Sequence, residues 1–312
     1  MTSHMTHILA LDFGGTRVRA ALFDASMQMV DRAETLTLVP EGEAAVIQRI
    51  IATGKSVVPD GCQLRGIGVA APGPLDTKRG VILHAKTLPG WSNVPLALLL
   101  SAAFDHAPTF VENDANLGAV AEYHMGAGQG ADPMIYLTIS TGIGGGAIIN
   151  GKLFTGADAL AIEPGHMRFT LPDGSHRRLE ELASGTAIGD WANHYLQEGS
   201  NPSILADYPV VDGQAVGQAA MTRDPLALSV VAEAGRWLGL GLVNLIHLFN
   251  PQVIVLGGSV IQLGDLLLDP ARKMIQDNIL DSAFYNNDLL REATIAEDVC
   301  LVGAALHCRN QL

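Results

Sequence analysis

The sequence predicts an α/β protein built from two domains. Its 312 residues exceed what one small core needs. Hydrophobic residues make up 48% of the chain but aromatic residues only 5%, so the cores must consist mainly of Val, Ile, Leu and Ala, as in buried sheets covered by helices. A strand, a glycine turn and a second strand occur near the start and again near the middle, which indicates two related halves.

The first half opens with a hairpin. Residues 7–11 and 18–23 have the pattern of strands, and Asp12-Phe13-Gly14-Gly15-Thr16 lies between them as a turn. The other elements expected here are a helix over 43–53, a strand over 64–71, a helix over 95–104, a strand over 108–111 and a helix over about 115–125.

The second half repeats the opening pattern. Residues 134–139 and 147–149 are expected strands, with a turn over 140–146 and a two-residue hairpin at Asn150-Gly151. An apolar helix over 232–248 and a strand over 253–256 follow later. We expect an N-terminal α/β domain over 1–115, with a C-terminal helix at about 298–312 packing back on it, and a larger α/β domain over 116–297.

The charge and the cysteines exclude several classes of protein. The formal net charge of −13 repels phosphate backbones and anionic lipids, so we expect neither nucleic acid nor a membrane as a partner. Cys62, Cys300 and Cys308 are odd in number and show no metal-ligating spacing. The first seven residues lack a signal pattern, and the most apolar stretch, 237–249, is shorter than the ~20 residues that span a bilayer. A soluble cytoplasmic protein is expected.

The two glycine turns predict a site for phosphate groups. Glycine at a hairpin tip leaves backbone N–H groups accessible, and two such tips could hold a polyphosphate between them. The candidates are Gly14, Gly15 and Thr16 in the first turn and Thr141, Gly142 and Gly144 in the second. Ordinary hairpin turns are the alternative. The sequence argues against a dinucleotide fingerprint, because residues 147–151 have the pattern of a strand and a turn, whereas that fingerprint requires a helix.

Four polar side chains lie where a substrate or its metal ion could be bound. Asp114 precedes a predicted helix, where it could cap the helix or accept a proton from a substrate hydroxyl. Glu163 and His166 lie in the turn Glu-Pro-Gly-His, where they could be structural or could hydrogen-bond neighbouring hydroxyls. Asp12, at a strand end, could hold Mg²⁺ directly or through water.

The ordered set of motifs resembles that of the ROK family (repressors, open reading frames and kinases), and within it the bacterial glucokinases. The set runs in family order from about residue 7 to residue 306, and it is specific although each motif alone is weak. The motifs are Leu11-Asp12-Phe13-Gly14-Gly15-Thr16, Pro72-Gly73-Pro74-Leu75-Asp76, Leu88-Pro89-Gly90-Trp91, Glu112-Asn113-Asp114-Ala115-Asn116, residues 140–146, Glu163-Pro164-Gly165-His166-Met167, Leu179-Glu180, Ala183-Ser184-Gly185-Thr186 and residues 250–258.

The resemblance implies roles for individual residues. Asp114 is the expected catalytic base. The expected sugar-binding residues are Asn113, Glu163, His166, Glu180 and Gly73. The expected nucleotide-binding residues are Asp12, Gly14, Gly15, Thr16, Thr141, Gly142, Gly257 and Gly258, with Asp12 also facing Mg²⁺.

The resemblance also implies a fold and an activity. The expected fold is the two-domain actin-like (ribonuclease H-like) fold of sugar kinases, with the active site in a cleft between the domains. The expected reaction transfers the γ-phosphoryl group of ATP, with Mg²⁺, to glucose, and the expected assembly is a homodimer. N-acetylmannosamine and N-acetylglucosamine are alternative substrates. A sugar sensor or a transcriptional regulator of the same family is a further alternative, but regulators need an N-terminal helix-turn-helix, and the first strand begins by about residue 7.

The chain departs from the family pattern at three places. Residues 169–178 replace the family's Cys-rich zinc loop and contain no cysteine, so we expect no structural zinc. Leu171 and Leu179 are then expected to brace the Glu-Pro-Gly-His turn by packing. Pro164 replaces a larger apolar residue and Thr87 replaces an Asn of many glucokinases, and both changes touch the expected sugar pocket.

Overall fold

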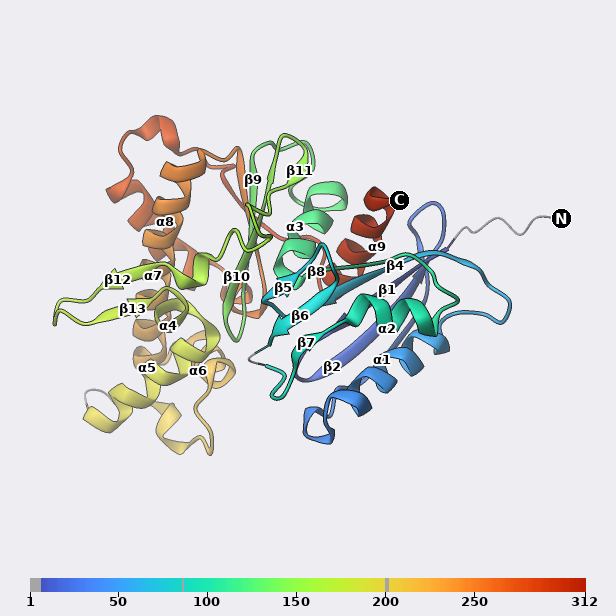
Figure 1. Ribbon diagram of the computed structural model, residues 1–312. Coiled ribbons are helices and arrows are strands. Elements are labelled where there is room, and N and C mark those ends of the chain that lie inside the picture. Colours follow the sequence, from blue (N-terminus) through green and yellow to red (C-terminus); the bar gives the residue numbers. More distant parts are fainter. Residues whose placement is uncertain (1–6, 86, 200–201) are drawn as a thin grey trace. The chain divides into compact units, whose positions relative to one another are not determined.

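The computed structural model describes residues 7–85, 87–199 and 202–312 (Figure 1). The chain divides into two compact units. The first runs to Gln129 and also includes Leu153–Ala161 and Ile295–Leu312, and the second comprises Gly130–Lys152 and Ile162–Thr294. Helix α3 (Asp114–Met125) packs against α9 (Val299–Gln311) and therefore groups with the first unit, whereas the sequence-based division began the second domain at residue 116.

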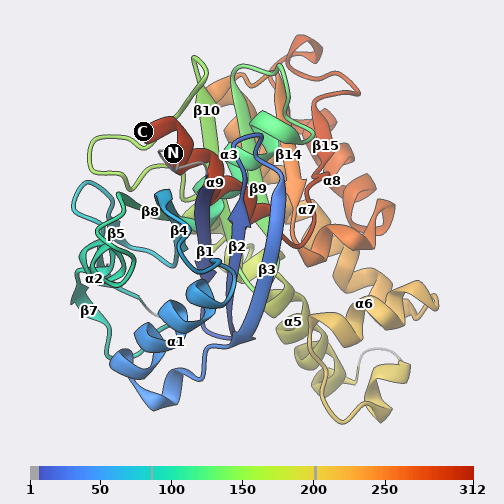
Figure 2. The same cartoon turned by 90° about the vertical axis from the view of Figure 1, so that its right-hand side faces the viewer.

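The first unit is built on a five-stranded sheet in the order β3-β2-β1-β4-β8, and Figure 2 shows β1, β2 and β3 side by side. Antiparallel pairs join β1 to β2 and β2 to β3, whereas β1, β4 and β8 are parallel. The strands are β1 (His7–Phe13), β2 (Arg17–Phe23), β3 (Met29–Leu36), β4 (Leu64–Ala71) and β8 (Thr109–Asn113). The hairpin predicted around the first glycine turn is confirmed.

The two faces of this sheet carry different helices because side chains alternate along each strand. In β4, Ile67 and Val69 enter the apolar core that includes Val46 of α1 (Glu43–Ser56). Gly68 points the other way, and a Cβ on it would lie 2.0 Å from the carbonyl oxygen of Ala304 in α9. Glycine therefore allows α9 to approach the strand this closely. The unit also contains α2 (Leu96–Ala103) and a small sheet of β5 (Leu75–Asp76), β6 (Val81–His84) and β7 (Ser92–Val94).

The second unit repeats the plan of the first. Its sheet has the order β11-β10-β9-β14-β15, with β9 and β10 antiparallel and β9, β14 and β15 parallel. The strands are β9 (Met134–Ile139), β10 (Ile143–Ile149), β11 (Lys152–Leu153), β14 (Val253–Gly257) and β15 (Leu290–Glu292). Each sheet thus places a hairpin beside parallel strands, and this shared strand order confirms the prediction of two related halves.

Strand β10 begins at Ile143, so the turn predicted over 140–146 is shorter than expected. A Cβ on Gly145 would lie 2.8 Å from Cγ of Pro164 and 3.0 Å from the carbonyl oxygen of Tyr136. Glycine here makes room for the 3-10 turn η2 (Pro164–His166) to pack on the strand. Close approach of two backbone segments, rather than turn geometry, requires this glycine.

Asn150 and Gly151 form the predicted two-residue turn after β10. Their φ angles are 54° and 70°, and φ is positive at both central residues in a type I′ turn. The carboxylate of Asp132 accepts hydrogen bonds from both backbone N–H groups, at 2.8 and 2.7 Å. This carboxylate, which lies two residues before the start of β9, therefore braces the turn.

Helix α7 (Pro225–Phe249) begins earlier than the helix predicted over 232–248. Asp224 caps it by accepting a hydrogen bond from the N–H of Ala227 at 2.9 Å, and Pro225 occupies the first turn; both are start signals that the prediction missed. Among the described helices, α7 alone is long and apolar enough to cross a membrane, but 61% of its most apolar window is buried inside the protein. Its apolar side lies in the core of the second unit.

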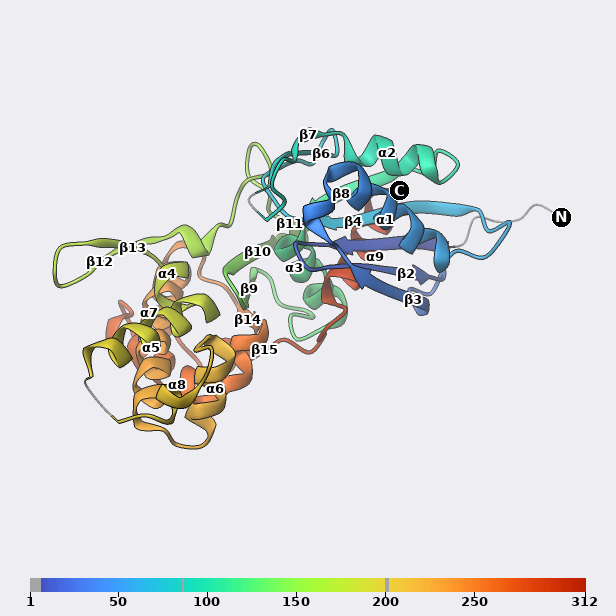
Figure 3. The same ribbon diagram turned by 90° about the horizontal axis from the view of Figure 1, so that it is seen from below.

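A two-stranded hairpin occupies residues 168–178, where the resemblance predicted a shorter segment without zinc. Figure 3 shows it extending away from the helices of its own unit. Leu179 is buried in the core as expected, but Phe169, which packs on Trp237 with ring centroids 5.8 Å apart, takes the place expected for Leu171. The other strands and α-helices described in this unit are β12 (Arg168–Thr170), β13 (His176–Arg178), α4 (Glu180–Ala183), α5 (Gly185–Glu198), α6 (Gly213–Met221) and α8 (Asp265–Asn278).

Candidate active site

The parallel strands of the first sheet bring three predicted site residues to one edge. Asp12 lies near the end of β1, Asn113 ends β8, and Gly73 follows β4. Because these strands are parallel neighbours, their carboxyl ends lie at the same edge of the sheet. A Cβ on Gly73 would lie 3.5 Å from Nδ2 of Asn113, so this pair is in close proximity.

Asn113, rather than Asp114, caps helix α3. Its side-chain oxygen accepts hydrogen bonds from the N–H groups of Ala115 and Asn116, at 3.0 and 3.4 Å. Asp114 is the first helical residue and is exposed, and its Oδ1 accepts from the N–H of Ala115 at 2.8 Å. The alternative that Asp114 serves as the cap is therefore wrong. Burial of the carboxylate by the surrounding protein raises the pKa of Asp114, and the hydrogen bonds that it accepts oppose that rise.

Asp12 is a buried carboxylate with one paired oxygen. Its Oδ2 lies 2.6 Å from Nη2 of Arg19. Burial raises the pKa of Asp12 to about 6; Arg19 opposes this rise, and the charge of Asp114 adds to it. A further positive charge beside Asp12 would keep this carboxylate ionised at neutral pH.

Two residues near Asp12 were not predicted as parts of the site. Arg19 is the register partner of Asp12 in the β1–β2 hairpin. The hairpin expected from the sequence ended its first strand at residue 11 and left Asp12 in the turn, so it did not reveal this pair. The thiol of Cys300 donates to the backbone carbonyl of Asp114 with an Sγ–O distance of 3.8 Å. Burial and the charges of Asp12 and Asp114 raise the pKa of this thiol well above its usual value, so the thiol stays protonated.

The first glycine turn uses some of the groups that were expected to face phosphate. The N–H of Gly14 donates to the carbonyl oxygen of Arg17 at 3.1 Å, inside the hairpin. Buried Thr37 braces the turn, since its N–H donates to Thr16 O and its hydroxyl to Gly14 O. A Cβ on Gly14 would meet nothing within 4 Å, whereas one on Gly15 would lie 3.3 Å from the carbonyl oxygen of Thr87. Gly14 therefore provides open space for a ligand, but its own N–H already donates within the hairpin.

The second glycine turn lies against Glu180. The N–H of Ser140 donates to the carbonyl oxygen of Gly142 at 2.9 Å and closes the turn. Oε2 of Glu180 accepts from the N–H of Ile143 at 3.2 Å, and its Oε1 lies 3.8 Å from Nη1 of Arg178. Glu180, predicted to bind sugar, therefore adjoins Gly142, predicted to bind nucleotide.

Glu163 and His166 flank the part of η2 that packs on β10. Pro164 and Gly165 are buried, and a Cβ on Gly165 would lie 2.2 Å from the carbonyl oxygen of Ile143. Glu163 and His166 are exposed on either side of this buried pair. The start of β10 therefore brings Glu163, His166 and Glu180 to one region of the second unit.

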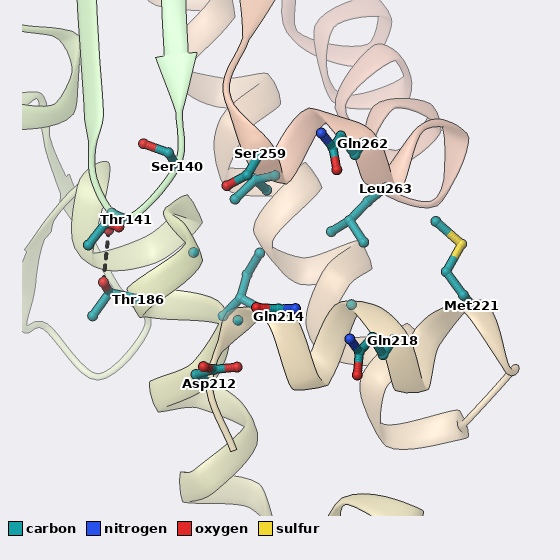
Figure 4. Close-up of a pocket in the computed structure, with 15 residues that line it drawn as sticks. Ser140, Thr141, Thr186, Asp212, Gln214, Gln218, Met221, Ser259, Gln262 and Leu263 are labelled. Carbon is teal, nitrogen blue, oxygen red and sulfur yellow. Dashed lines mark hydrogen bonds between the residues drawn. The ribbon is translucent and has the colours of Figure 1, made fainter. Parts of the chain in front are cut away.

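A cavity of about 620 Å³ opens beside the second glycine turn (Figure 4). Thr141, Thr186, Asp212 and Ser259 line it from four separate segments, and the hydroxyl of Thr186 donates to the carbonyl oxygen of Thr141 at 2.8 Å. Its other polar side chains include the amides of Gln214, Gln218 and Gln262. No sequence pattern predicted these side chains as a group.

Gly257 and Gly258 position the segment that enters this cavity. A Cβ on Gly257 would lie 2.8 Å from the Tyr136 hydroxyl, and one on Gly258 would lie 2.3 Å from the carbonyl oxygen of Ile139. Gly258 also has a φ of 93°, which favours glycine. The two glycines hold the chain against β9, and the next residue, Ser259, lines the cavity.

Curated relatives cover almost the whole chain. Residues 8–311 match the ROK family. The glucokinase of Thermotoga maritima is 32% identical, over 96% of this chain and 96% of that protein. A xylose repressor of Caldicellulosiruptor bescii is 30% identical, over 71% of this chain and 57% of the repressor.

Solved structures of ROK family proteins are also similar to this chain. A ROK family glucokinase from Streptomyces griseus, in complex with glucose and AMPPNP, has a TM-score of 0.80 and 31% identity, and the match covers 97% of this chain and 99% of that one. A ROK hexokinase from Thermus thermophilus has a TM-score of 0.78 and 31% identity, covering 98% of both chains. The predicted two-domain actin-like fold is confirmed by these neighbours. This chain belongs to the ROK family.

Proposed function

We propose that this protein is an ATP-dependent sugar kinase that converts glucose to glucose 6-phosphate. The observation that carries the proposal is Asp114, an exposed carboxylate in the first turn of α3, at the sheet edge that also holds Asp12, Gly73 and Asn113. The relatives support the substrate and the donor, because the T. maritima protein is a glucokinase and the S. griseus glucokinase binds glucose and AMPPNP.

Asp114 would act as the general base. The sugar hydroxyl oxygen forms a bond to the γ-phosphorus of ATP, the bond from that phosphorus to the β-phosphate oxygen breaks, and the hydroxyl proton passes to the carboxylate of Asp114. The products are the sugar phosphate and ADP. The hydrogen bond from the N–H of Ala115 fixes the carboxylate at 2.8 Å, and such positioning supplies much of the rate in phosphoryl transfer.

Asp12 would face Mg²⁺, directly or through water. A buried carboxylate whose pKa stays near 6 beside Arg19 fits this ion, since Mg²⁺ prefers oxygen ligands and is commonly held by one or two carboxylates together with substrate phosphates. When bound, Mg²⁺ would offset the negative charge of the phosphates. The residues proposed to face those phosphates are Gly14, Gly15, Thr16, Thr141 and Gly142.

The sugar would be held by hydrogen bonds from several side chains. The residues proposed to bind the sugar are Asn113, Glu163, His166 and Glu180. Gly73, which has no side chain, would leave room for the sugar beside Asn113. Glu163 and His166 are exposed beside Glu180 at the start of β10, where their polar atoms are accessible. A bound sugar would bury these groups, and each one then left unpaired costs about 1–3 kcal/mol, so the site would reject sugars that lack one hydroxyl.

The cavity beside Thr141 would take the nucleoside of ATP. Its volume of about 620 Å³ is ample for a nucleoside, and its lining combines hydroxyls, amides and apolar groups. Gly257 and Gly258 would lie near the adenosine, since they lead into Ser259, which lines the cavity. We further propose a cytoplasmic homodimer that binds neither nucleic acid nor a membrane, in keeping with the net charge of −13.

Two other functions compete with glucose phosphorylation. The same site could accept N-acetylmannosamine or N-acetylglucosamine, because none of the proposed ligands specifies the group on C2. A non-catalytic sugar sensor or regulator is the alternative that the xylose repressor match supports. The presence of both Asp12 and Asp114 favours catalysis.

A coupled assay for ADP release tests the proposal. Purified protein is given MgATP and, in turn, glucose, mannose, fructose, allose, N-acetylglucosamine or N-acetylmannosamine, and the Asp114→Asn variant is the matched control. We expect turnover to depend on the sugar and to be fastest with glucose. If an amino sugar is the fastest substrate, that sugar replaces glucose as the proposed substrate. If none of these sugars is turned over, the result supports the non-catalytic sugar sensor.

A further inference from the structure

The chain returns from the second unit to the first at Ile295, and side chains of the first unit hold this return segment (residues 295–298). Glu122 is fully buried, and its Oε1 accepts from the N–H of Ile295 at 2.8 Å. On the other side, Nε of Arg32 donates to Oδ1 of Asp298 at 2.8 Å. The return segment is therefore anchored at both ends.

Arg19 holds the middle of the return segment and also holds Asp12. Its Nη1 donates to the backbone carbonyl of Glu297 at 2.6 Å, and its Nη2 lies 2.6 Å from Oδ2 of Asp12. Only 21% of the Arg19 side chain is exposed. The two nitrogens belong to one rigid planar group, so a displacement of the carbonyl is transmitted to the carboxylate.

Neighbouring arginines of the same sheet lack this double contact. Arg17, two residues before Arg19 on β2, is 56% exposed and pairs with Glu34 on β3. Arg32 contacts the return segment but pairs there with carboxylates on the surface. Of the three, Arg19 alone joins the return segment to Asp12.

We propose that Arg19 is a positioning residue that couples the return segment to Asp12. The inference rests on the proposed function, in which Asp12 faces the phosphates. Movement of the return segment, as the protein binds and releases substrates, would shift the carbonyl of Glu297 and with it the orientation of the Asp12 carboxylate. Arg19 then acts on the rate of phosphoryl transfer and leaves sugar binding unchanged.

Three variants test the coupling. Arg19→Gln removes the charge and weakens both contacts, whereas Arg19→Lys keeps a charge beside Asp12 but cannot span both partners with one nitrogen. Arg32→Gln is the matched control, because it loosens the return segment without touching Asp12. For each variant we would measure kcat and sugar KM, and separately the amide hydrogen exchange of residues 295–300 in the protein without substrates.

The expected outcome separates coupling from charge alone. Arg19→Gln and Arg19→Lys should both lower kcat roughly 10- to 100-fold, the size of effect that misplacing a catalytic group by about 1 Å can have, with sugar KM within about twofold. Both should speed exchange over 295–300. Arg32→Gln should speed the same exchange with a much smaller loss of kcat.

Other outcomes would overturn the coupling. Wild-type kcat in Arg19→Lys would mean that charge alone matters, and unchanged exchange in both Arg19 variants would mean that Arg19 does not hold the segment. If Arg19→Gln does not fold, the kcat and the hydrogen exchange of Arg19→Lys still decide whether charge alone matters and whether Arg19 holds the segment. If the wild-type protein phosphorylates no sugar, the proposed function is contradicted instead. The exchange measurement still decides whether Arg19 holds the segment.

Discussion

The carboxylate of Glu180 accepts a hydrogen bond from the backbone N–H of Ile143 at 3.2 Å, and this contact attaches a proposed sugar ligand to the second glycine turn. A Cβ on Gly142 would lie 2.5 Å from the same Oε2. The size of residue 142 therefore controls where the Glu180 carboxylate can lie.

Gly142→Ala should raise the KM for sugar. The added methyl would displace the Glu180 carboxylate, and the loss of about one hydrogen bond to a charged group corresponds to roughly a tenfold rise in KM. Sugar titrations at saturating ATP measure it. An unchanged KM for sugar would show that Glu180 is not a sugar ligand.

Gly14→Ala provides the contrasting change in the first turn. Nothing lies within 4 Å of the added Cβ, so we expect the melting temperature of the protein to stay the same. If phosphates occupy that space, the KM for ATP should rise at least several-fold while the KM for sugar does not change. Wild-type kinetics with ATP would mean that the space beside Gly14 holds no part of the nucleotide.

Asp114→Asn should separate catalysis from folding. The amide is a poor proton acceptor, so kcat should fall by roughly 100-fold or more with little change in sugar affinity. The free energy of unfolding should be nearly unchanged, because Asn113 supplies the cap. Asn113→Ala, in contrast, should lower that free energy by about 1 kcal/mol. Near-normal turnover by Asp114→Asn would contradict the role of Asp114 as base.

His307 should make the protein less stable as the pH falls below neutrality. Burial lowers the pKa of His307 from 6.5 to about 4. The unfolded chain therefore binds a proton at a higher pH than the folded protein, and stability is lost as the pH falls from about 6.5 towards 4. Between pH 7 and pH 5 the loss is at most about 2 kcal/mol.

Urea unfolding at several pH values measures this contribution when wild type is compared with His307→Gln. Asp12 changes stability in the opposite direction, since the raised pKa of this acid makes the folded state bind the proton more readily. The difference between the two proteins removes that shared contribution. Identical pH dependence in both would show that His307 does not titrate differently on folding.

Structural zinc is predicted to be absent. The family's zinc loop is replaced by the hairpin of β12 and β13, which contains no cysteine. Within residues 7–85, 87–199 and 202–312, no group of three His, Cys, Asp or Glu side chains is arranged to hold a metal. Metal analysis of tag-free protein should find well under one zinc per chain, and chelator should leave the melting temperature unchanged. Stoichiometric zinc that resists dialysis would contradict this.

The sequence revealed the repeated hairpins because each consists of local signals: an apolar strand, a glycine turn and a second strand. It left Asp114 open as either a cap or a base and did not reveal Asn113 as the cap of α3, because the two residues are adjacent and both residue types cap helices well. It also placed Gly145 in a turn, because a glycine needed for close packing against Pro164 cannot be told from a turn glycine without knowing what packs there.

The same distinction applies to the candidate site. Candidate residues that belong to one local motif, such as Asp12 and Gly14, could be proposed from the sequence. The cavity does not, because Thr141, Thr186, Asp212 and Ser259 come from segments that only tertiary packing brings together. Arg19 lies between these cases, because the sequence predicted the hairpin that contains it, but only the strand register in the structure pairs it with Asp12.

The position of α9 affects the order in which the protein can fold during its synthesis. Gly68 and Gly303 let α9 lie almost in backbone contact with β4 and α3, since a Cβ on Gly303 would lie 2.0 Å from the carbonyl oxygen of Leu117. The ribosome makes β4 and α3 long before it makes α9. Until residues 295–312 emerge, this face of the nascent first unit has no covering helix, while the second unit is already complete in sequence. The first unit can therefore complete its fold only after all residues of the second unit have been synthesised.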